Sequence, residues 1–243
     1  MSKAIIPNTI TCCNLICGCI ATAAGFDGGF LTAFAFILLG AFFDFFDGLT
    51  ARSLGVSGKF GIQLDSLADI VTFGVAPSAM LFSMFSKVAY PAFMYSSFWF
   101  TVMPFTAFLI AAFSALRLAK FNIDERQTTS FIGLATPPNA ILWASVAAYP
   151  YTQTTSTFAW IMVGLSLLCC YLLVCEIPFF SFKSVGKHRT RIIIFIVGCI
   201  VLIAGSIAWA VICQDPKKAV VAGALCILWY INYNFIIQTL LHK

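Results

Sequence analysis

Charged residues are scarce in this sequence. Only 9% of its 243 residues are Asp, Glu, Lys or Arg, and 61% are hydrophobic, whereas a soluble domain carries about 25% charged and 45–50% apolar residues. This composition excludes a water-soluble surface, because most of the chain must face lipid. We therefore predict one integral-membrane domain over residues 1–243, an all-α polytopic helix bundle. The net charge of +5 does not indicate a nucleic-acid partner, because the basic residues lie in short connections between apolar stretches.

Histidine is also scarce, and this bears on the ten cysteines. The two histidines, His188 and His242, lie far from the main cysteine cluster, and a zinc site needs a defined set of four ligands. Cysteine in an apolar helix behaves as a small hydrophobe. We therefore expect small packing residues, with a soft-metal site inside the membrane as the alternative. The cluster consists of Cys12, Cys13, Cys17 and Cys19.

Long apolar runs dominate the sequence, and a helix that crosses a bilayer needs about 20 such residues. The runs predict about eight spans, a six-helix core followed by two C-terminal helices; six spans with two peripheral helices is the alternative. The first run leads straight into the next, so we expect a retained helix rather than a cleaved signal peptide. The predicted spans are 4–26, 28–52, 60–86, 88–116, two within 127–175 separated by Tyr149–Thr157, 192–214 and 219–241.

Basic residues are unevenly distributed between the two sides of the predicted bundle. With an even number of spans, both termini lie on one side. Of the 14 Lys and Arg residues, only Lys87, Lys217 and Lys218 fall on the other side. Cytoplasmic loops carry an excess of Lys and Arg. We therefore expect a multi-pass protein of the cytoplasmic (inner) membrane with both termini in the cytoplasm.

Acidic residues number only nine, and four of them lie close together in two apolar segments. Asp44 and Asp47 are three residues apart, and Asp65 and Asp69 are four apart. Either spacing places both side chains on one face of a helix. The intervening Ser53–Phe60 contains glycine and serine, which suit a short turn. The two helices are therefore expected to be antiparallel neighbours whose carboxylates converge on the cytoplasmic side.

Converging carboxylates near a bilayer need a compensating positive charge, and intramembrane charges are functional by default. Oxygen ligands favour hard cations such as Mg²⁺, Mn²⁺ or Ca²⁺. Four carboxylates can hold two such ions about 3.5–4 Å apart, an arrangement that clamps a phosphoryl group during in-line displacement. A solvated acidic loop is one alternative, although phenylalanines flank the aspartates. A cation or proton transporter is the other.

Small residues and one arginine accompany the aspartates. Gly48 lies one turn from Asp44, and Ala51 lies one turn beyond Asp47, so a ligand has room to approach the backbone. Arg52 can form a bidentate pair with phosphate oxygens. A transporter does not explain these residues, whereas a phosphate-bearing substrate does.

The segment from Asp44 to Asp69 resembles the signature of the CDP-alcohol phosphatidyltransferases. It reads D-x-x-D-G-x-x-A-R, then Ser53–Phe60, then G-x-x-x-D-x-x-x-D, without a departure. The resemblance extends over most of the chain. Pro7–Asn14 is similar to the family's entry segment. Ala115–Asn122 and Phe131–Ala140 are similar to the branch that makes phosphatidylserine from CDP-diacylglycerol, although Lys120 stands where many members have Arg.

The resemblance implies a membrane enzyme that uses two divalent cations, Mg²⁺ or Mn²⁺, to transfer a phosphatidyl group from CDP-diacylglycerol to L-serine. Asp44, Asp47 and Asp65 would bind one cation, and Asp47, Asp65 and Asp69 the other. Asp69 would also be the catalytic base, and the active site would face the cytoplasm. A homodimer is compatible with the resemblance, but no heptad or small-residue motif establishes an interface. The implied CDP-lipid-binding residues are Asn8, Thr11, Asn14, Gly48, Ala51, Arg52 and Gly61.

Recognition of serine needs groups for its carboxylate and its ammonium. Ordinary explanations also exist for the candidate residues, because Arg and Lys anchor cytoplasmic helix ends and the prolines after Thr136 suit a helix start. Glycerol 3-phosphate or inositol phosphate as acceptor, or an archaeal-type lipid donor, is the alternative within the same chemistry. A non-enzymatic function, the transport of divalent cations, is the other alternative. The acceptor candidates are Arg117, Lys120, Asn122, Thr136 and Asn139.

Overall fold

Helices account for almost all of the described chain. The computed structural model describes residues 3–56, 58–88, 98–124, 131–150, 155–179 and 189–241, and it confirms the predicted all-α architecture. The helices are α1 (Ile5–Asp27), α2 (Phe30–Leu54), α3 (Lys59–Asp69), α4 (Ala76–Ser86), α5 (Phe98–Val102), α6 (Phe108–Ile123), α7 (Thr136–Ala148), α8 (Ser156–Val174), α9 (Arg189–Ile212) and α10 (Val221–Leu241). Shorter elements are a π-helical turn (Ile70–Val75), 3₁₀ turns (Met103–Ala107 and Pro216–Val220) and the paired strands β1 (Phe131–Ile132) and β2 (Pro178–Phe179).

Within the described ranges, seven helical segments are long and apolar enough to cross a membrane. The fifth predicted span corresponds to α7, whose 13 residues extend about 20 Å, less than the roughly 30 Å hydrocarbon core of a bilayer. The chain is therefore a multi-pass membrane bundle in which one core helix is short. The seven segments are Ile5–Asp27, Phe30–Leu54, Lys59–Ser86, Met103–Ile123, Ser156–Val174, Ile192–Ile212 and Pro216–Ile236.

The fourth predicted span ends later in the chain than the sequence predicts. The sequence predicts it over residues 88–116, whereas the structure has helical turns from Phe98 that end at Ile123; residues 89–97 lie outside the described part. The helix continues beyond residue 116 because its charged side chains find partners. Arg117 donates to Thr136, and Lys120 lies 3.4 Å from Glu176.

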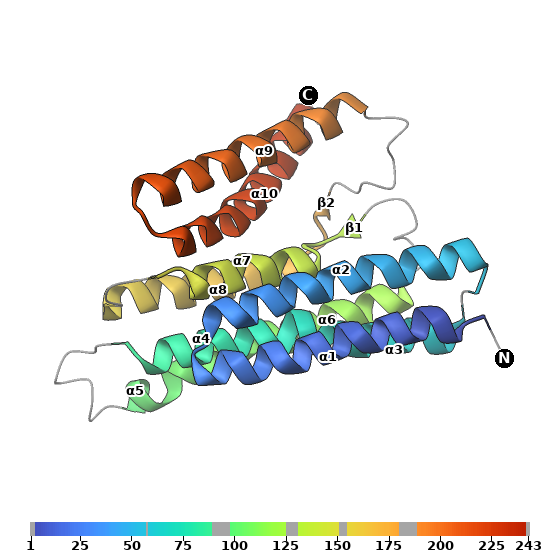
Figure 1. The fold of residues 1–243 in the computed structure, drawn as a ribbon, viewed down its shortest axis with the longest axis horizontal. Helices are drawn as coiled ribbons and strands as arrows, with labels where there is room; N and C mark the ends of the chain where they lie inside the picture. The colour runs from blue at the N-terminus through green and yellow to red at the C-terminus, as the bar shows by residue number, and fades with distance from the viewer. Residues whose placement is uncertain are drawn as a thin grey trace.

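Two glycines end α1 and α2, and the turns that they form place each following helix against α1. Gly28 follows α1 with a φ of 80°, and Gly55 follows α2 with a φ of 65°. Glycine adopts this left-handed conformation without the steric cost that other residues meet. As a result, α2 returns along α1, and α3 begins beside the start of α1 (Figure 1).

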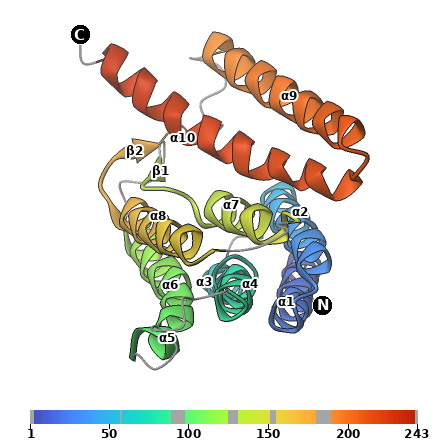
Figure 2. The same cartoon turned by 90° about the vertical axis from the view of Figure 1, so that its left-hand side faces the viewer.

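The continuous helix Lys59–Ser86 runs through the middle of the bundle. Viewed along the helices, α3 and α4 lie between α1, α6 and α7 (Figure 2). In its apolar stretch 72% of residues are buried, compared with 11% in Ile192–Ile212. Ala76, Ala79 and Met80 are completely buried. Small side chains allow helices in a membrane to approach closely, and this explains the central position.

The last two long helices, α9 and α10, form an antiparallel pair on one side of the bundle. α10 packs across α7, and α9 packs on α10 (Figures 1 and 2). Trp229 of α10 lies against Gly198 of α9, and its indole nitrogen donates to the Phe195 carbonyl at 3.4 Å. A second apolar cluster joins this pair to the rest of the molecule. It contains Leu134, Leu172, Cys175 and Tyr230.

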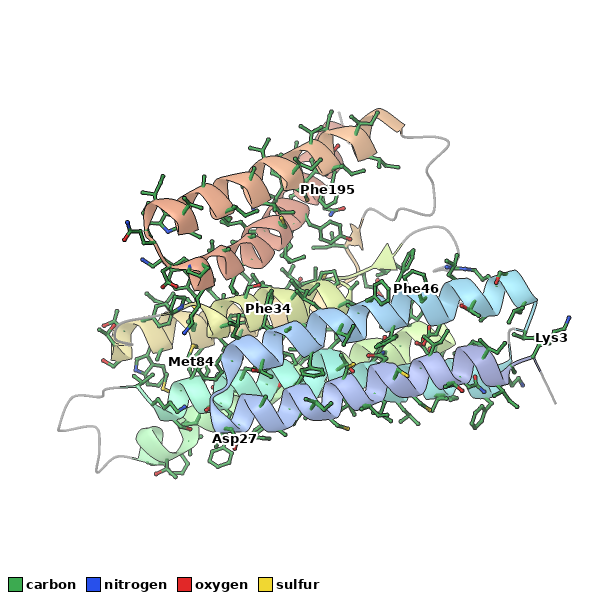
Figure 3. All side chains as sticks on the ribbon, viewed as in Figure 1. Lys3, Asp27, Phe34, Phe46, Met84 and Phe195 are labelled. Carbon is green, nitrogen blue, oxygen red and sulfur yellow. The ribbon has the colours of Figure 1, made fainter. Side chains whose placement is uncertain are left out.

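One end of the bundle gathers the N-terminus and the predicted site residues. Figure 3 shows Lys3 at this end and Asp27 at the opposite end of α1, with Phe46 of α2 nearer to the Lys3 end. The end of α2, the start of α3 and the end of α6 reach the same end (Figure 1). Segments far apart in the sequence are thus brought together there.

Candidate active site

Four aspartates lie on α2 and α3, toward the end of the bundle that holds the N-terminus. Asp44 and Asp47 belong to α2, Asp65 belongs to α3, and Asp69 is the last residue of α3. Carboxylate oxygens of Asp44, Asp47 and Asp65 all lie within 4.8 Å of one another. The convergence expected from their spacing is therefore present for these three residues.

This cluster has the properties of a divalent-cation site. Asp47 is only 5% exposed. Among the described residues, Asp47 Oδ2 and Asp65 Oδ1 are buried oxygens with no hydrogen-bond partner. Buried carboxylates this close to one another are costly unless a positive charge compensates them. A donor set made only of oxygen suits a hard cation, so Asp44, Asp47 and Asp65 fit such an ion.

Asp69 is close to the cluster but has a different environment. It is buried, and its carboxylate interacts electrostatically with Asp44, Asp65 and Asp47. It does not belong to the set within 4.8 Å in the part of the chain that the structure describes. Instead, Asn14 of α1 donates a hydrogen bond from Nδ2 to Asp69 Oδ1 at 3.1 Å. A ligand role for Asp69 therefore stays a prediction, and a contact that orients this carboxylate is present.

The helix widens into a π-helical turn directly after Asp69. The turn covers Ile70–Val75, whereas the sequence predicts an unbroken helix there. Thr72 Oγ1 donates to the Asn14 carbonyl at 3.0 Å, and Asn14 in turn bonds Asp69. These two bonds fix the end of α3 against α1. Such π-helical turns are frequent at functional sites.

A pocket opens beside the aspartates, between α1, α2 and α3. Its cavity volume is about 230 Å³, and Asp47, Asp65 and Arg52 form part of its wall. An added Cβ at Gly48 would meet no described atom within 4 Å, so this glycine leaves open space at the wall. Of the seven predicted CDP-lipid residues, six line the pocket: Asn8, Thr11, Gly48, Ala51, Arg52 and Gly61.

The seventh predicted residue lies outside the pocket lining, so its role in binding the CDP-lipid stays a prediction. Asn14 does not line the pocket and is held by Asp69 instead. Four further lining residues, none of which has a polar side chain, are absent from the residues predicted from the sequence. Position alone could have identified two of them, since one precedes Asn8 and another follows Gly61. These four are Pro7, Val56, Gly58 and Ile62.

Arg117 of α6 brings a buried positive charge to the same region. The residue is 7% exposed, and its Nη1 donates to Thr136 Oγ1 at 3.4 Å. Its guanidinium carbon lies 5.1 Å from the centre of the Phe121 ring. It also interacts electrostatically with Asp69 and Asp44. Arg117 therefore links the aspartates to the start of α7.

Comparison with known proteins agrees with this geometry. The family model for CDP-alcohol phosphatidyltransferase matches residues 4–179, which include every residue of the pocket. This chain belongs to the CDP-alcohol phosphatidyltransferase family. It is therefore an enzyme, and the transporter alternative is set aside. The match ends before α9, so the pair α9–α10 lies outside the matched region of this CDP-alcohol phosphatidyltransferase.

Individual relatives carry more specific names. A Bacillus subtilis protein named CDP-diacylglycerol–serine O-phosphatidyltransferase is 36% identical over 76% of this chain and 94% of the relative. A Methanocaldococcus jannaschii protein of the same name is 30% identical over 67% of this chain and 70% of the relative. An archaetidylserine synthase from Methanothermobacter thermautotrophicus is 30% identical over 67% of this chain and 66% of the relative.

In this phosphatidyltransferase, the first turn of α7 carries two buried polar side chains, Thr136 and Asn139. Thr136 is fully buried and accepts the hydrogen bond from Arg117. Asn139 follows three residues later, on the same helix face. It is also fully buried, and neither atom of its amide has a hydrogen-bond partner among the described residues. Because leaving a buried polar group unsatisfied is costly, this amide suits contact with a polar ligand.

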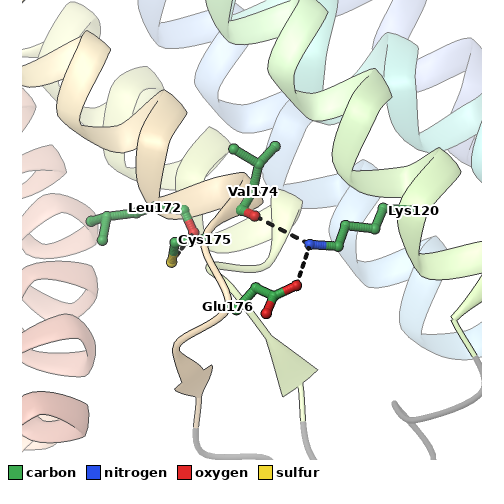
Figure 4. Close-up of polar contacts among 5 residues, drawn as sticks. All are labelled: Lys120, Leu172, Val174, Cys175 and Glu176. Atoms are coloured by element: carbon green, nitrogen blue, oxygen red, sulfur yellow. Dashed lines mark hydrogen bonds and ion pairs between the residues drawn. The ribbon is translucent and has the colours of Figure 1, made fainter.

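The two other predicted acceptor residues of the transferase are engaged elsewhere. Lys120 Nζ lies 3.4 Å from Glu176 Oε1 and 3.5 Å from the Val174 carbonyl, at the end of α8 (Figure 4). Asn122 Nδ2 donates to Ser66 Oγ at 2.8 Å. These contacts tie α6 to α8 and to α3, so both residues have structural partners.

Proposed function

We propose that this chain transfers the phosphatidyl group of CDP-diacylglycerol to L-serine, releasing phosphatidylserine and CMP. The main support is the close set of Asp44, Asp47 and Asp65 at a pocket that also contains Arg52. The names of the Bacillus subtilis and Methanocaldococcus jannaschii relatives support serine as the acceptor. In this proposal residues 1–243 act as one membrane domain.

Two divalent cations, Mg²⁺ or Mn²⁺, are the proposed cofactors. Asp44, Asp47 and Asp65 would hold one of them, and Asp47, Asp65 and Asp69 the other. Asp47 and Asp65 each have a buried oxygen with no hydrogen-bond partner among the described residues. This supports the proposal that these two carboxylates bind both cations. Bound cations of this kind polarise phosphoryl oxygens and stabilise the charge that develops on a leaving phosphate.

The pocket residues would bind and orient the CDP-lipid. The Arg52 guanidinium would pair with phosphate oxygens, for which its planar fork is well suited. Asn8 and Thr11 would donate hydrogen bonds to the nucleotide or its phosphates. Gly48 and Ala51 would leave the space that the head group needs, while the acyl chains remain among the helices. Gly61 lies opposite Asn8 and would serve the same purpose.

Asp69 would act as the general base. The serine hydroxyl oxygen attacks the β-phosphorus, the bond from that phosphorus to the bridging oxygen breaks, and CMP leaves. The hydroxyl has a high pKa, so transfer of its proton to Asp69 favours formation of the new bond. Asn14 would orient Asp69 through its hydrogen bond to Oδ1, which leaves Oδ2 to receive the proton.

The acceptor would bind beside Asp69, toward α6 and α7. Arg117 would bind the serine carboxylate, since arginine forms bidentate pairs with carboxylates. Thr136 and Asn139 would form hydrogen bonds with the rest of the amino acid. In support, the amide of Asn139 has no hydrogen-bond partner among the described residues. Lys120 and Asn122 would act indirectly, by holding α6 in place.

The proposed location is the cytoplasmic membrane with the active site facing the cytoplasm. Asp44 and Asp47 flank Phe46, which lies nearer to the Lys3 end of the bundle than to the Asp27 end (Figure 3). With the spans predicted from the sequence, that side would receive all Lys and Arg except Lys87, Lys217 and Lys218, and such an excess is typical of cytoplasmic loops.

The deciding experiment measures CMP release from CDP-diacylglycerol by the detergent-purified protein, with Mg²⁺ or Mn²⁺ and with or without L-serine. We expect serine-dependent CMP and phosphatidylserine, lost after EDTA and in Asp65→Asn. CMP released only with glycerol 3-phosphate or inositol phosphate would overturn the serine assignment. Activity confined to a CDP-activated archaeal-type lipid would instead align the chain with its archaetidylserine synthase relative. No CMP with any alcohol would overturn the proposal as a whole.

A further inference from the structure

Thr72, in the π-helical turn after Asp69, uses its hydroxyl differently from most described serines and threonines. Thr22 and Ser78 donate to carbonyls four residues earlier in their own helical segments, which is a common bond for such hydroxyls in helices. Thr72 Oγ1 instead donates across helices, to the Asn14 carbonyl of α1 at 3.0 Å. The Thr72 side chain is completely buried and does not line the pocket. Any part that it plays in the reaction is therefore indirect.

Asn14 is bound at two points by the same short segment. Its backbone carbonyl accepts from Thr72, and its side-chain Nδ2 donates to Asp69 Oδ1 at 3.1 Å. Asp69 and Thr72 are three residues apart, so the two bonds close a ring around the start of the π-helical turn Ile70–Val75. A shift of this turn along α1 would lengthen both bonds together. The Thr72 bond therefore determines where Asp69 meets the Asn14 amide.

Two glycines allow Thr72 to approach the neighbouring helices closely. A side chain at Gly18 of α1 would clash with Thr72 Oγ1, and a side chain at Gly40 of α2 would clash with Thr72 Cγ2. Small residues permit such close contact between membrane helices. The hydroxyl thus faces α1 and the methyl group faces α2, so substitutions can separate the hydrogen bond from the packing.

Packing does not explain the amide that this arrangement holds. Asn14 is completely buried, and its Oδ1 has no hydrogen-bond partner among the described residues. Leaving a buried polar atom unsatisfied is costly, and a leucine of similar shape would avoid that cost. The Asn14 amide nitrogen, however, bonds the carboxylate of the proposed general base. The contacts that hold Asn14 therefore serve Asp69.

We propose that Thr72 is a positioning residue for the general base. Its hydroxyl holds the π-helical turn on α1, and this lets Asn14 bind Asp69 Oδ1 and leaves Oδ2 to receive the proton of the acceptor hydroxyl. The inference rests on the proposed role of Asp69 and gives the π-helical turn a part in turnover. Because Thr72 does not line the pocket, its loss should change kcat rather than the binding of the CDP-lipid or serine.

The first test compares two variants of the full-length enzyme. Thr72→Val loses the hydroxyl and keeps a methyl group toward Gly40, whereas Thr72→Ser keeps the hydroxyl and loses the methyl group. Thr72→Val should lower kcat by roughly tenfold or more, because a small misplacement of a catalytic group slows a reaction steeply. Both KM values should stay unchanged, and Thr72→Ser should keep the wild-type kcat.

The opposite pattern, with a low kcat in Thr72→Ser and a normal one in Thr72→Val, would show that Thr72 acts by packing and would overturn the proposal. A wild-type kcat in both variants would overturn it as well. If valine prevents folding, Thr72→Ala replaces it in the comparison with Thr72→Ser, since alanine and serine differ only by the hydroxyl.

The matched control is Ser83→Ala. Ser83 belongs to the same continuous helix and also donates to a carbonyl of α1, that of Phe26 at 3.3 Å, near the Asp27 end of the bundle (Figure 3). Ser83→Ala and Thr72→Val should both lower the melting temperature in detergent, but only Thr72→Val should lower kcat. An equal loss of kcat in both would show that any weakened contact with α1 slows turnover, and it would overturn the positioning role.

The second test asks whether Thr72 acts through the Asn14 amide. In an Asn14→Leu background the bond to Asp69 is gone, while the backbone carbonyl that Thr72 binds remains. Thr72→Val should then still lower the melting temperature but no longer change kcat, so the two kcat effects should be non-additive. Equal kcat effects of Thr72→Val in both backgrounds would overturn the inference.

Failure of the proposed function gives different results. An Asp69→Asn enzyme with the wild-type kcat would overturn the base assignment on which the inference rests. A wild-type enzyme that releases no CMP with any alcohol would overturn the proposed transfer itself.

Discussion

The helix Lys59–Ser86 and the helix α9 are both long apolar segments, but their surroundings are opposite. In the first, 72% of the apolar stretch is buried, and in the second 11%. The buried helix carries small side chains such as Ala76 and Ala79, while α9 exposes large branched ones such as Ile193 and Ile200. Small residues allow close contact between helices, whereas lipid accommodates large aliphatic side chains without a cost. Side-chain size therefore separates helices that contact protein from those that contact lipid.

The two helices also differ in what they carry. Lys59–Ser86 contains Asp65 and Asp69, the π-helical turn and Thr72, all of which contact other helices. α9 contributes apolar contacts through Phe195 and Gly198. Polar groups in a membrane protein need partners from neighbouring helices. The site is therefore built where the helices are most closely surrounded by protein.

The largest expected effect comes from a charge change in the buried region. Asp47→Asn keeps the side-chain shape but removes a negative charge that the proposed cations require, so CMP release should fall by about 10²–10³-fold. The control is Asp215→Asn in the turn between α9 and α10, where asparagine can still accept the hydrogen bond from the Lys217 N–H. The control should keep the wild-type rate. An Asp47→Asn enzyme with nearly full activity would remove Asp47 from the proposed cation site.

The next effect tests the packing difference directly. Ala79→Leu inserts a larger side chain into the fully buried face of α4, next to Gly25 of α1. It should lower the free energy of unfolding by about 1–3 kcal/mol. Ala204→Leu makes the same change on the exposed face of α9 and should alter stability by less than about 0.5 kcal/mol. Reversible unfolding in mixed micelles measures both, and equal losses would show that α9 is as closely packed as α4.

A third change separates function from stability within the buried region. Asn139→Leu removes an amide with no hydrogen-bond partner among the described residues, so stability should stay constant or rise by about 1 kcal/mol. If Asn139 contacts serine, the KM for serine should rise by roughly tenfold or more, the cost of a lost hydrogen bond. The control Asn232→Leu lies at an exposed position of α10 and should change neither quantity. Lower stability with an unchanged KM would make Asn139 a structural residue.

Much of this arrangement follows from the sequence, for physical reasons. Apolar runs with short polar breaks predict membrane helices, and i, i+3 and i, i+4 spacings followed by a short turn predict convergence of carboxylates. Asp44, Asp47 and Asp65 satisfy that expectation. The roles assigned to them, and to Asp69, remain predictions. Six of the seven expected lipid-binding residues line one pocket, because α1, α2 and α3 meet at one end.

Other features depend on tertiary contacts that no local pattern encodes. The end of α6 lies beyond the predicted limit because Arg117 and Lys120 find partners on α7 and after α8. The π-helical turn after Asp69 is held by Asn14 of α1, far away in the sequence. Tyr230 stands in an apolar run, and only the tertiary packing of α10 brings it into one cluster with Leu134 and Leu172.

The smallest effect concerns Lys120, for which sequence and structure suggest different roles. Its ion pair with Glu176 is partly exposed, with side-chain exposures of 37% and 70%. Such pairs contribute only about 0.2–1 kcal/mol. Lys120→Met should therefore lower stability slightly and leave the KM for serine unchanged, and Glu176→Gln, as the matched change of the partner, should do the same. A serine KM that rises in Lys120→Met but not in Glu176→Gln would return Lys120 to the acceptor site. The proposed acceptor site would then extend from Thr136 and Asn139 to the end of α6.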